Sequence, residues 1–246
     1  MRCLIVSDIH GNLEAFEAVL NHAGPVDSIW CLGDLVGYGP DPNACVELLR
    51  SRPHLCIAGN HDWSALGRLD LAEFNPDARE ASLWTRKQLT PDNLAFLEAL
   101  PKELPEPAQE HFWLAHGSPC HPIWEYILDD RTATDAFGCF QATFCFHGHT
   151  HVPILIRLAN QQGSERLAWS QPPEEPHTLG PGRMLINPGS VGQPRDGNRQ
   201  ASYMLLDPEA LTVEHRRVDY EYWLTQDKML EHKLPPRLAM RLAYGL

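Results

Sequence analysis

Side chains that commonly bind divalent metals recur directly after short apolar runs of this sequence. Asp8 and His10 follow the run Cys3–Val6, and Asp34 follows Ser28–Leu32. The runs at 54–58, 112–115 and 143–146 are followed in turn by Asn60 with His61, by His116, and by His149 with His151. Carboxylate, amide and imidazole groups without a thiolate suit Mn, Fe, Zn, Co or Ni better than an all-oxygen calcium site. We therefore expect these residues to hold two metal ions.

The apolar runs must position these side chains. Short runs of this kind, flanked by Gly or Asp, are typical of buried strands rather than of helices. The carboxyl ends of such strands meet at one edge of an open α/β sheet. Alternate side chains of an extended strand end point the same way, so Asp8 and His10 can face one metal, as can His149 and His151. Asp34 carries two carboxylate oxygens and can bridge two cations.

Helical patterns separate the first strands. Residues 12–23 carry an apolar stripe at Leu13, Phe16, Val19 and Leu20. Asp41-Pro42 opens a second helix, because proline is tolerated in the first helical turn. The order strand–helix–strand–helix–strand predicts a parallel sheet with right-handed crossovers.

The rest of the chain is predicted to complete a single domain over residues 1–246. A helical insertion is expected at about 63–107, with helix starts at Asn75-Pro76 and Thr90-Pro91. This insertion either packs on a sheet face or caps the substrate. Residues 159–182 lack periodicity and predict an exposed excursion. Strands are expected at 184–186, 202–206 and 211–218, and C-terminal helices at about 220–246.

Composition restricts the partners and the compartment. The chain has 246 residues and a net charge of −12, which disfavours nucleic acid and anionic membranes as partners. No apolar stretch is long enough to span a membrane or to form a signal-peptide core, so we expect a cytoplasmic protein. The seven cysteines include no Cys-x-x-Cys pair, and we expect them to be reduced rather than joined in disulfides.

Five short motifs occur in order along the chain and resemble those of the calcineurin-like metallophosphoesterase superfamily. They are Asp8-Ile9-His10, Gly33-Asp34, Gly59-Asn60-His61-Asp62, His116-Gly117 and Gly148-His149-Thr150-His151. The segment Asn187-Pro188-Gly189-Ser190-Val191 extends the similarity towards the small bacterial and archaeal phosphodiesterases of that superfamily.

The resemblance implies a fold and a ligand set. The fold is a four-layer α/β sandwich with two mixed β-sheets flanked by helices. One divalent metal ion is assigned to Asp8, His10 and His151. The other is assigned to Asn60, His116 and His149, with Asp34 as the bridge between the two ions.

The chemistry expected of this set is phosphoester hydrolysis. Two cations that share a hydroxide can attack phosphorus in line and neutralise the phosphoryl oxygens. His61, next to the ligand Asn60, is the expected general acid near the leaving oxygen. Manganese is the metal that we expect to support activity best in an assay.

One motif departs from the protein phosphatases of this superfamily. These enzymes carry an Asp-Arg-Gly after the bridging carboxylate, where this chain has Gly37-Tyr38-Gly39. The Asp that would orient the catalytic histidine and the phosphate-binding Arg are both missing, which disfavours a protein phosphatase. Arg195 and Arg199 are the best substitutes for binding phosphate, although both could equally be solvent-exposed loop cations. His121 is a further candidate for substrate contact.

The sequence leaves three functions in competition. The first is a dinuclear-metal phosphoesterase acting on a small phosphodiester or phosphomonoester. The second is a nuclease of the same superfamily, which would want a basic track. The third is a non-catalytic binding scaffold. A homodimer through the apolar C-terminal segment is also possible from the sequence.

Overall fold

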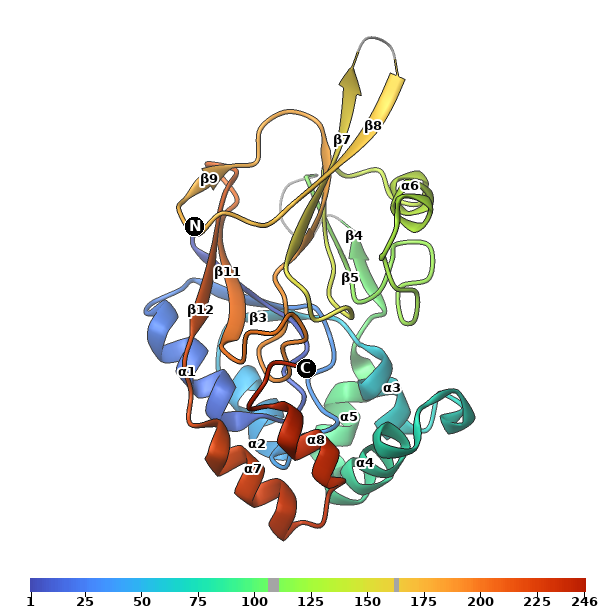
Figure 1. Cartoon of the computed structure of the whole chain (residues 1–246), viewed down its shortest axis with the longest axis vertical. Coiled ribbons are helices and arrows are strands. Elements are labelled where there is room, and N and C mark those ends of the chain that lie inside the picture. Colours follow the sequence, from blue (N-terminus) through green and yellow to red (C-terminus); the bar gives the residue numbers. More distant parts are fainter. Residues whose placement is uncertain (106–110, 162–163) are drawn as a thin grey trace.

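The first of two six-stranded sheets contains the earliest strands of the chain. The computed structural model describes residues 1–105, 111–161 and 164–246. Within these residues the sheet has the order β3 (His54–Cys56), β2 (Ser28–Cys31), β1 (Cys3–Val6), β11 (Ala201–Asp207), β12 (Thr212–Val218) and β9 (His177–Thr178) (Figure 1). Strands β1, β2 and β3 are parallel, as the sequence predicts, and β11 pairs antiparallel with β1.

The second sheet faces the first. Its order is β4 (Glu103–Pro105), β5 (Phe112–Ala115), β6 (Phe144–Phe146), β10 (Arg183–Asn187), β7 (Ile154–Gln161) and β8 (Ser164–Ser170). Strands β5, β6 and β10 are parallel, whereas β4, β7 and β8 each pair antiparallel with a neighbour. Both sheets are therefore mixed.

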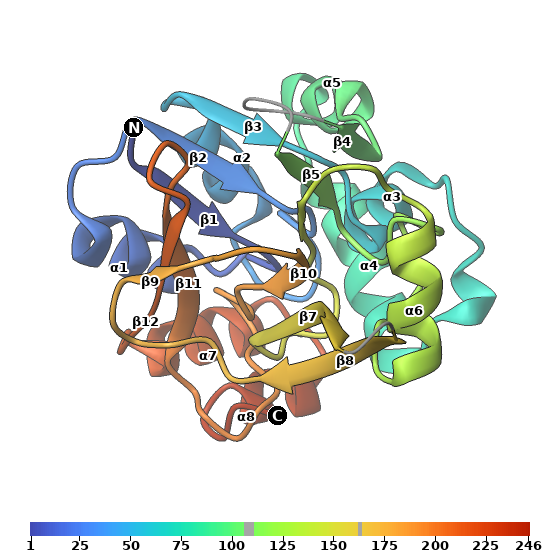
Figure 2. The ribbon, with the colours of Figure 1, turned by 90° about the horizontal axis from the view of Figure 1, so that it is seen from above.

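Three apolar clusters divide the molecule into layers. Trp30 and Met204 of the first sheet pack against Phe112 and Phe146 of the second. The outer face of the first sheet packs on α1 (Leu13–Ala23), α2 (Pro42–Arg50) and α5 (Pro91–Ala99), and the outer face of the second packs on α6 (Asp130–Gly138) (Figure 2). The expected α/β sandwich of two mixed sheets flanked by helices is confirmed.

The helices begin where their capping residues predict. The side chains of Asn12, Asn75 and Thr90 accept hydrogen bonds from backbone N–H groups at the starts of α1, α4 (Pro76–Gln88) and α5. Between α2 and α4 lie α3 (Asn60–Leu66) and the 3₁₀ turn η1 (Leu71–Glu73). The helical prediction for 63–107 is wrong at its end, because residues 103–105 form strand β4; residues 106 and 107 lie outside the described residues.

The C-terminal helices α7 (Tyr222–Glu231) and α8 (Pro236–Arg241) cover one side of α4. Met229, Leu238 and Leu242 bury their side chains in a cluster with Ala81 and Tyr38. Other apolar side chains of this segment stay exposed, namely Trp223, Leu230, Met240 and Tyr244. The homodimer remains a prediction.

The prediction for residues 159–182 is also wrong. The excursion at 159–182 contains the end of β7, all of β8 and β9, although residues 162–163 lie outside the described residues. The side chains of β8 from Arg166 to Ser170 are exposed or half-buried, so its pairing leaves no apolar alternation in the sequence.

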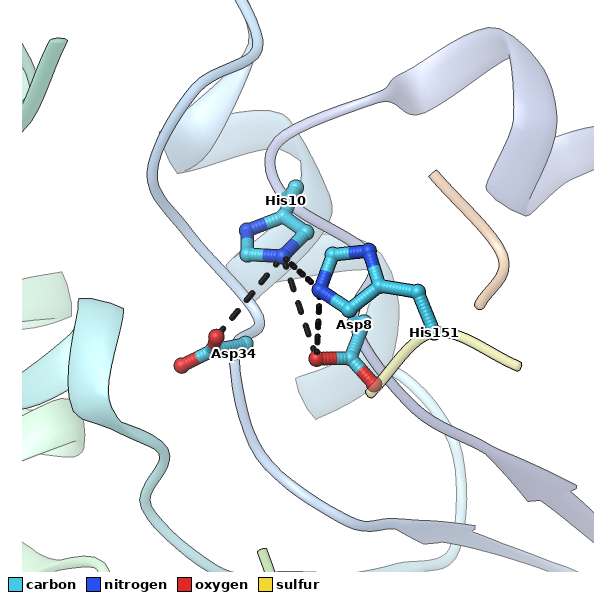
Figure 3. Close-up of side chains that lie close together, drawn as sticks. All are labelled: Asp8, His10, Asp34 and His151. Carbon is cyan, nitrogen blue, oxygen red and sulfur yellow. Dashed lines mark hydrogen bonds and ion pairs between the residues drawn. The ribbon is translucent and has the colours of Figure 1, made fainter. Parts of the chain in front are cut away.

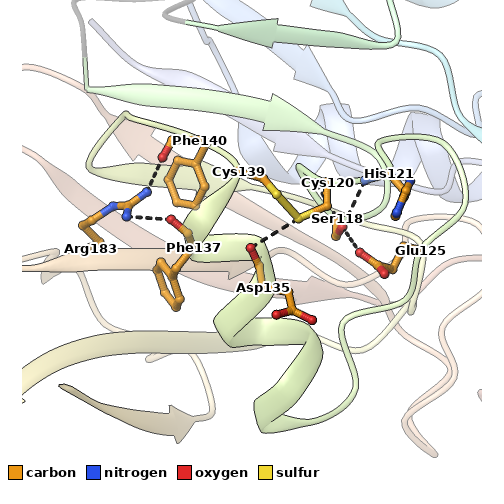
Figure 4. The surroundings of a disulfide bond; sticks show 9 residues. All are labelled: Ser118, Cys120, His121, Glu125, Asp135, Phe137, Cys139, Phe140 and Arg183. Carbon is orange, nitrogen blue, oxygen red and sulfur yellow. Dashed lines mark hydrogen bonds between the residues drawn. A yellow bond between two sulfur atoms is a disulfide. The ribbon is translucent and has the colours of Figure 1, made fainter. Parts of the chain in front are cut away.

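The cysteines are not all reduced. Cys120 and Cys139, 19 residues apart, form a disulfide between the loop after β5 and the end of α6 (Figure 4). The other cysteines are buried thiols, as expected. The sequence carried no local signal for this pair, because only the packing of α6 on the second sheet brings the two residues together. Among the described helices, none has the length and hydropathy needed to cross a membrane.

Candidate metal centre

The predicted metal ligands meet at the edge where strands of both sheets end. Asp8 and His10 follow β1, Asp34 follows β2, and Asn60 starts α3 just after β3. His116 follows β5, and His149 and His151 follow β6. We call these seven residues the ligand cluster. None exposes more than 3% of its surface, so the cluster is enclosed by protein.

One group in the cluster is formed by Asp8, His10, Asp34 and His151 (Figure 3). The Nε2 atom of His151 lies 3.2 Å from Asp8 Oδ1 and 3.2 Å from His10 Nε2. His10 Nε2 lies 3.6 Å from Asp34 Oδ2. Four potential ligand atoms thus face a common centre.

A second group is formed by Asp34, His116 and His149. His116 Nε2 lies 3.3 Å from Asp34 Oδ2, 3.1 Å from His149 Nδ1 and 3.0 Å from Asn60 Oδ1. The amide oxygen of Asn60 therefore joins this group. Asp34 belongs to both groups and lies between them.

Backbone carbonyls orient the imidazole rings. The Nδ1 atoms of His10, His116 and His151 lie 3.3, 2.9 and 2.6 Å from the carbonyl oxygens of Val36, Leu32 and Gln193. An Nδ1–H that donates to a carbonyl leaves the Nε2 lone pair of a neutral ring directed into the cluster. In the first group, the lone pairs of His10 and His151 then face each other beside two carboxylates, an arrangement that a cation satisfies.

Two carboxylate oxygens in the cluster also indicate a site for a cation. Asp8 Oδ1 and Asp34 Oδ2 are buried and accept no hydrogen bond within the described parts of the chain. A buried carboxylate oxygen without a hydrogen bond is costly unless it is paired with a charge or binds a metal. The donor set of carboxylate, imidazole and amide groups fits divalent transition metals.

The backbone at the ligands adopts an uncommon conformation. Asp8, His10, Asp34, His149 and His151 all have φ between 52° and 67°. Such left-handed conformations cost about 1–3 kcal/mol each and tend to gather at functional sites. Two glycines leave room for side chains that approach them closely. A Cβ atom at Gly59 would lie 2.1 Å from Asp34 Oδ1, and one at Gly148 would lie 1.9 Å from Ser7 Oγ.

The pKa values of five residues in the ligand cluster are lowered. Burial acts to raise the pKa values of Asp8 and Asp34, but the neighbouring histidines, His151 for Asp8 and His116 for Asp34, hold both below their usual range. Burial lowers the pKa values of His10, His149 and His151. All five pKa values are lowered, which is the direction that favours metal binding, because a metal ligand must be deprotonated.

His116 differs from the other histidines. Burial acts to lower its pKa, but Asp34, Asp8 and the Leu32 carbonyl together outweigh burial and raise the value to about 9. A proton on His116 and a metal ion at Asp34 therefore compete for the same position.

His61 lies beside the cluster in the first turn of α3. Its backbone N–H donates to Asp34 Oδ1 at 2.7 Å, and its ring packs 4.2 Å from the ring of Tyr38 and 5.3 Å from that of Phe74. Its Nδ1 is buried and has no hydrogen-bond partner among the described residues. Burial is the largest cause that lowers the pKa of His61 to about 4, against the charge of Asp34.

The three predicted substrate contacts differ in position. Arg195 lies beside the cluster: its guanidinium is 6.0 Å from the Tyr38 ring centre, and its charge acts on the pKa values of His10 and His61. Arg199 instead approaches Asp219 at 3.8 Å and stacks over Tyr222. His121 is exposed at the turn after His116, where its backbone N–H bonds to Ser118.

Sequence reasoning missed two side chains at the site. Tyr38, in the segment noted only as a departure from a motif, packs edge-on against His10 at 4.7 Å. Tyr126 stacks on His149 with ring centres 3.8 Å apart, while the carbonyl of Trp124 lies 3.1 Å from His149 Nε2. A tyrosine following a motif glycine could have drawn attention to Tyr38, whereas nothing local in the sequence marks Tyr126.

Comparisons with known proteins identify the family. Residues 1–210 match the calcineurin-like phosphoesterase superfamily domain. A crystal structure of a metallophosphoesterase from Sphaerobacter thermophilus is 48% identical, covers 100% of this chain and 99% of its own, and superposes with a TM-score of 0.88. An uncharacterized protein of Methanocaldococcus jannaschii is 39% identical, over 98% of this chain and 97% of its own.

A more distant similarity concerns a named hydrolase. A symmetrical bis(5'-nucleosyl)-tetraphosphatase of Pseudomonas putida is 30% identical over 105 residues. The match spans 36% of this chain and 36% of that enzyme.

Proposed function

Because this chain belongs to the calcineurin-like phosphoesterase superfamily, a family of phosphoric ester hydrolases, we propose that it hydrolyses a small phosphodiester or phosphomonoester with two divalent metal ions. The observation that carries the proposal is the pair of ligand groups that share Asp34. Asp8 Oδ1 and Asp34 Oδ2, which accept no hydrogen bond among the described residues, support it, since Asp8 lies in one group and Asp34 in both.

Each ligand has a role in this proposal. Asp8, His10 and His151 would hold one ion, and Asp34 would hold both. The second ion would be held by Asn60, His116 and His149. When bound, the ions would lower the pKa of a shared water and neutralise charge on the phosphoryl oxygens. The buried ligands exclude bulk water from this region, which strengthens the electrostatic stabilisation of the transition state.

We assign His61 as the general acid that gives a proton to the leaving oxygen. Its ring is held between Tyr38 and Phe74 rather than by a carboxylate. With a pKa of about 4 the ring is neutral at pH 7. The negative charge of a bound phosphoester would act to raise this pKa, opposing burial and the charge of the two metal ions, and so favour the protonated ring that donates to the leaving oxygen.

Arg195 is the residue that we assign to phosphate binding. Its Nε is buried without a hydrogen-bond partner in the described residues, and one terminal nitrogen donates to the neutral Gln193 side chain at 2.9 Å. A guanidinium that lacks a carboxylate partner next to the cluster is suited to a phosphoryl oxygen. In this proposal Arg195 serves the role of the arginine that the protein phosphatases of the superfamily carry where this chain has Tyr38.

The substrate that we favour is small and nucleotide-like. The net charge of −12 disfavours a long nucleic acid, which needs a basic track. The partial similarity to a bis(5'-nucleosyl)-tetraphosphatase supports a nucleoside phosphoester.

The proposal is tested with bis-p-nitrophenyl phosphate and p-nitrophenyl phosphate. Purified protein is stripped with a chelator, reloaded with Mn or Ni, and its metal content is measured before each assay. We expect about two ions per chain and turnover of at least one ester, with none in the chelated protein. A protein that holds two ions and hydrolyses neither ester would contradict the proposal and favour a binding scaffold.

A further inference from the structure

Three aromatic side chains from two distant segments gather beside the ligand cluster. Phe74 precedes α4, while Trp124 and Tyr126 belong to the loop between β5 and α6. The rings of Phe74 and Trp124 lie 5.2 Å apart. We call these three residues the aromatic rim.

The rim is in direct contact with the residues of the proposed reaction. Phe74 packs edge-on against His61 at 5.3 Å, and Tyr126 stacks on His149. The Trp124 ring lies 6.3 Å from that of His149. A planar group placed on the rim is therefore next to a phosphate held at the metals.

Two side chains of the aromatic rim are exposed to solvent, although the histidine beneath them is buried. Trp124 exposes 39% of its surface and Tyr126 exposes 41%, whereas His149 beneath them exposes 2%. Large aromatic side chains exposed together at the edge of a polar site are typical of a ligand-binding surface.

Phe74 also lines a neighbouring cavity of about 260 Å³. Its wall is largely apolar, through Leu71, Pro76 and Leu83, while Arg79 and Glu80 contribute a charged donor and a charged acceptor. Apolar walls with a few polar groups at the edge suit a planar heterocycle, which stacks by its faces and forms hydrogen bonds by its rim.

The other tryptophans near this region have different partners. Trp84 packs against His232 at 5.2 Å and belongs to the cluster beneath α7 and α8. Trp63 has Arg68 over its ring. Neither therefore adds a ring to the rim.

We infer that Phe74, Trp124 and Tyr126 form a base-binding subsite, which takes the nucleobase of a nucleoside phosphoester whose phosphate lies at the metals. The inference rests on the proposed phosphoesterase function and adds the group that selects the substrate. Stacking on aromatic side chains tolerates every base, because each base has a π-face. The rim thus selects nucleoside esters over aliphatic esters without selecting one base.

The inference is tested with two esters that release the same p-nitrophenolate. Thymidine 5'-(p-nitrophenyl phosphate) carries a base on the retained side, and methyl p-nitrophenyl phosphate does not. We expect the wild type to prefer the nucleoside ester. Trp124→Ala should lower kcat/KM for the nucleoside ester about tenfold, the loss of one stacking contact, and leave the methyl ester within about twofold.

Two further variants separate stacking from folding. Trp124→Phe keeps a ring and should retain most of the preference. Trp223→Ala removes a tryptophan of similar exposure from α7 and should change neither ester. Equal loss on both esters in Trp124→Ala would overturn the inference, because it would assign Trp124 to holding His149 in place.

Equilibrium binding gives a readout that does not need turnover. A non-hydrolysable phosphonate analogue of thymidine 5'-monophosphate, titrated by calorimetry, should bind about tenfold more weakly to Trp124→Ala than to the wild type, while inorganic phosphate should bind both proteins alike. A wild type that cleaves the methyl ester without preferring the nucleoside ester overturns the inference but keeps the proposed function. If neither diester is cleaved and p-nitrophenyl phosphate is not cleaved either, the proposed function fails. Whenever neither diester is cleaved, the nucleotide-binding comparison alone decides the inference.

Discussion

The ligand cluster and the aromatic rim touch each other but are built in opposite ways. Cluster residues follow strand ends, are almost fully buried, and include five non-glycine residues with left-handed backbone. The rim comes from two loop segments and keeps Trp124 and Tyr126 about 40% exposed. The sheets therefore fix the groups to which we assign the reaction, while loops supply the surface to which we assign the nucleobase.

The largest effect on activity is expected inside the cluster. Asp34→Asn should remove both metal ions, because among the described residues only Asp34 belongs to both groups, and kcat/KM should fall by more than about 10³-fold. Asp8→Asn should mainly remove one ion. Metal analysis of the purified variants checks this difference. Loss of a single equivalent in both variants would refute the bridging role of Asp34.

His61 contacts both the ligand cluster, at Asp34, and the aromatic rim, at Phe74. His61→Gln should keep the metal content near that of the wild type while kcat falls about 10²–10⁴-fold, as expected for a lost general acid. The loss should be smaller for a p-nitrophenyl ester than for an alkyl ester, since p-nitrophenolate leaves without a proton. A uniform loss across leaving groups would instead indicate that His61 binds the phosphoryl oxygens.

Arg195 is expected to act on substrate binding rather than on the metals. Arg195→Ala should raise KM about 10–100-fold, because a hydrogen bond to a charged group contributes roughly 1.5–3 kcal/mol. Metal content should not change. Arg199→Ala is the matched control and should have little effect, since Arg199 contacts Asp219 and Tyr222. Similar KM values for Arg195→Ala and Arg199→Ala would refute the assignment of Arg195 to phosphate binding.

The disulfide should affect the rim more than the cluster. Cys120 lies in the loop that carries Trp124 and Tyr126, and its bond to Cys139 ties this loop to α6 (Figure 4). Replacing both cysteines by serine should lower the free energy of unfolding by about 2–4 kcal/mol and kcat/KM only a few-fold. Urea unfolding and metal analysis check this. A large loss of metal would show that the loop supports the cluster as well.

The smallest effect concerns stability alone and lies outside both regions. Burial, with the charge of Arg217, lowers the pKa of His215 to about 4 against the opposing charge of Asp196. The unfolded chain therefore binds more protons than the folded one between about pH 6.5 and 4, and stability from this residue is lost as the pH falls through that range.

His215→Gln provides the comparison for this pH dependence. His215 lies 2.8 Å from Ser202 Oγ, and a glutamine can retain a polar contact there. Urea unfolding of both proteins at pH 7 and pH 5 should show a smaller pH-dependent loss in the variant. Equal losses would assign the acid sensitivity to other groups, such as the cluster histidines.

Local sequence determined the fold class and the convergence of the cluster. Short apolar runs such as Cys3–Val6 favour buried strands, and the predicted ligands follow them directly, so Asp8, Asp34 and His116 could be expected at one edge. Helix starts at Asn12 and Asn75 were also predictable, because a cap depends on residues three positions apart. Such features are encoded within a few neighbours in the chain.

Tertiary packing alone decided the surroundings of that edge. No side chain of β8 from Arg166 to Ser170 is fully buried, so this part of the strand shows no alternation, and the bond between Cys120 and Cys139 depends on where α6 packs. Phe74 and Trp124 are 50 residues apart in the sequence, yet their rings lie 5.2 Å apart. The sequence therefore determined which groups can bind metal, because strand ends place them. The aromatic rim was decided only in three dimensions, since its contacts join loops that share no local pattern.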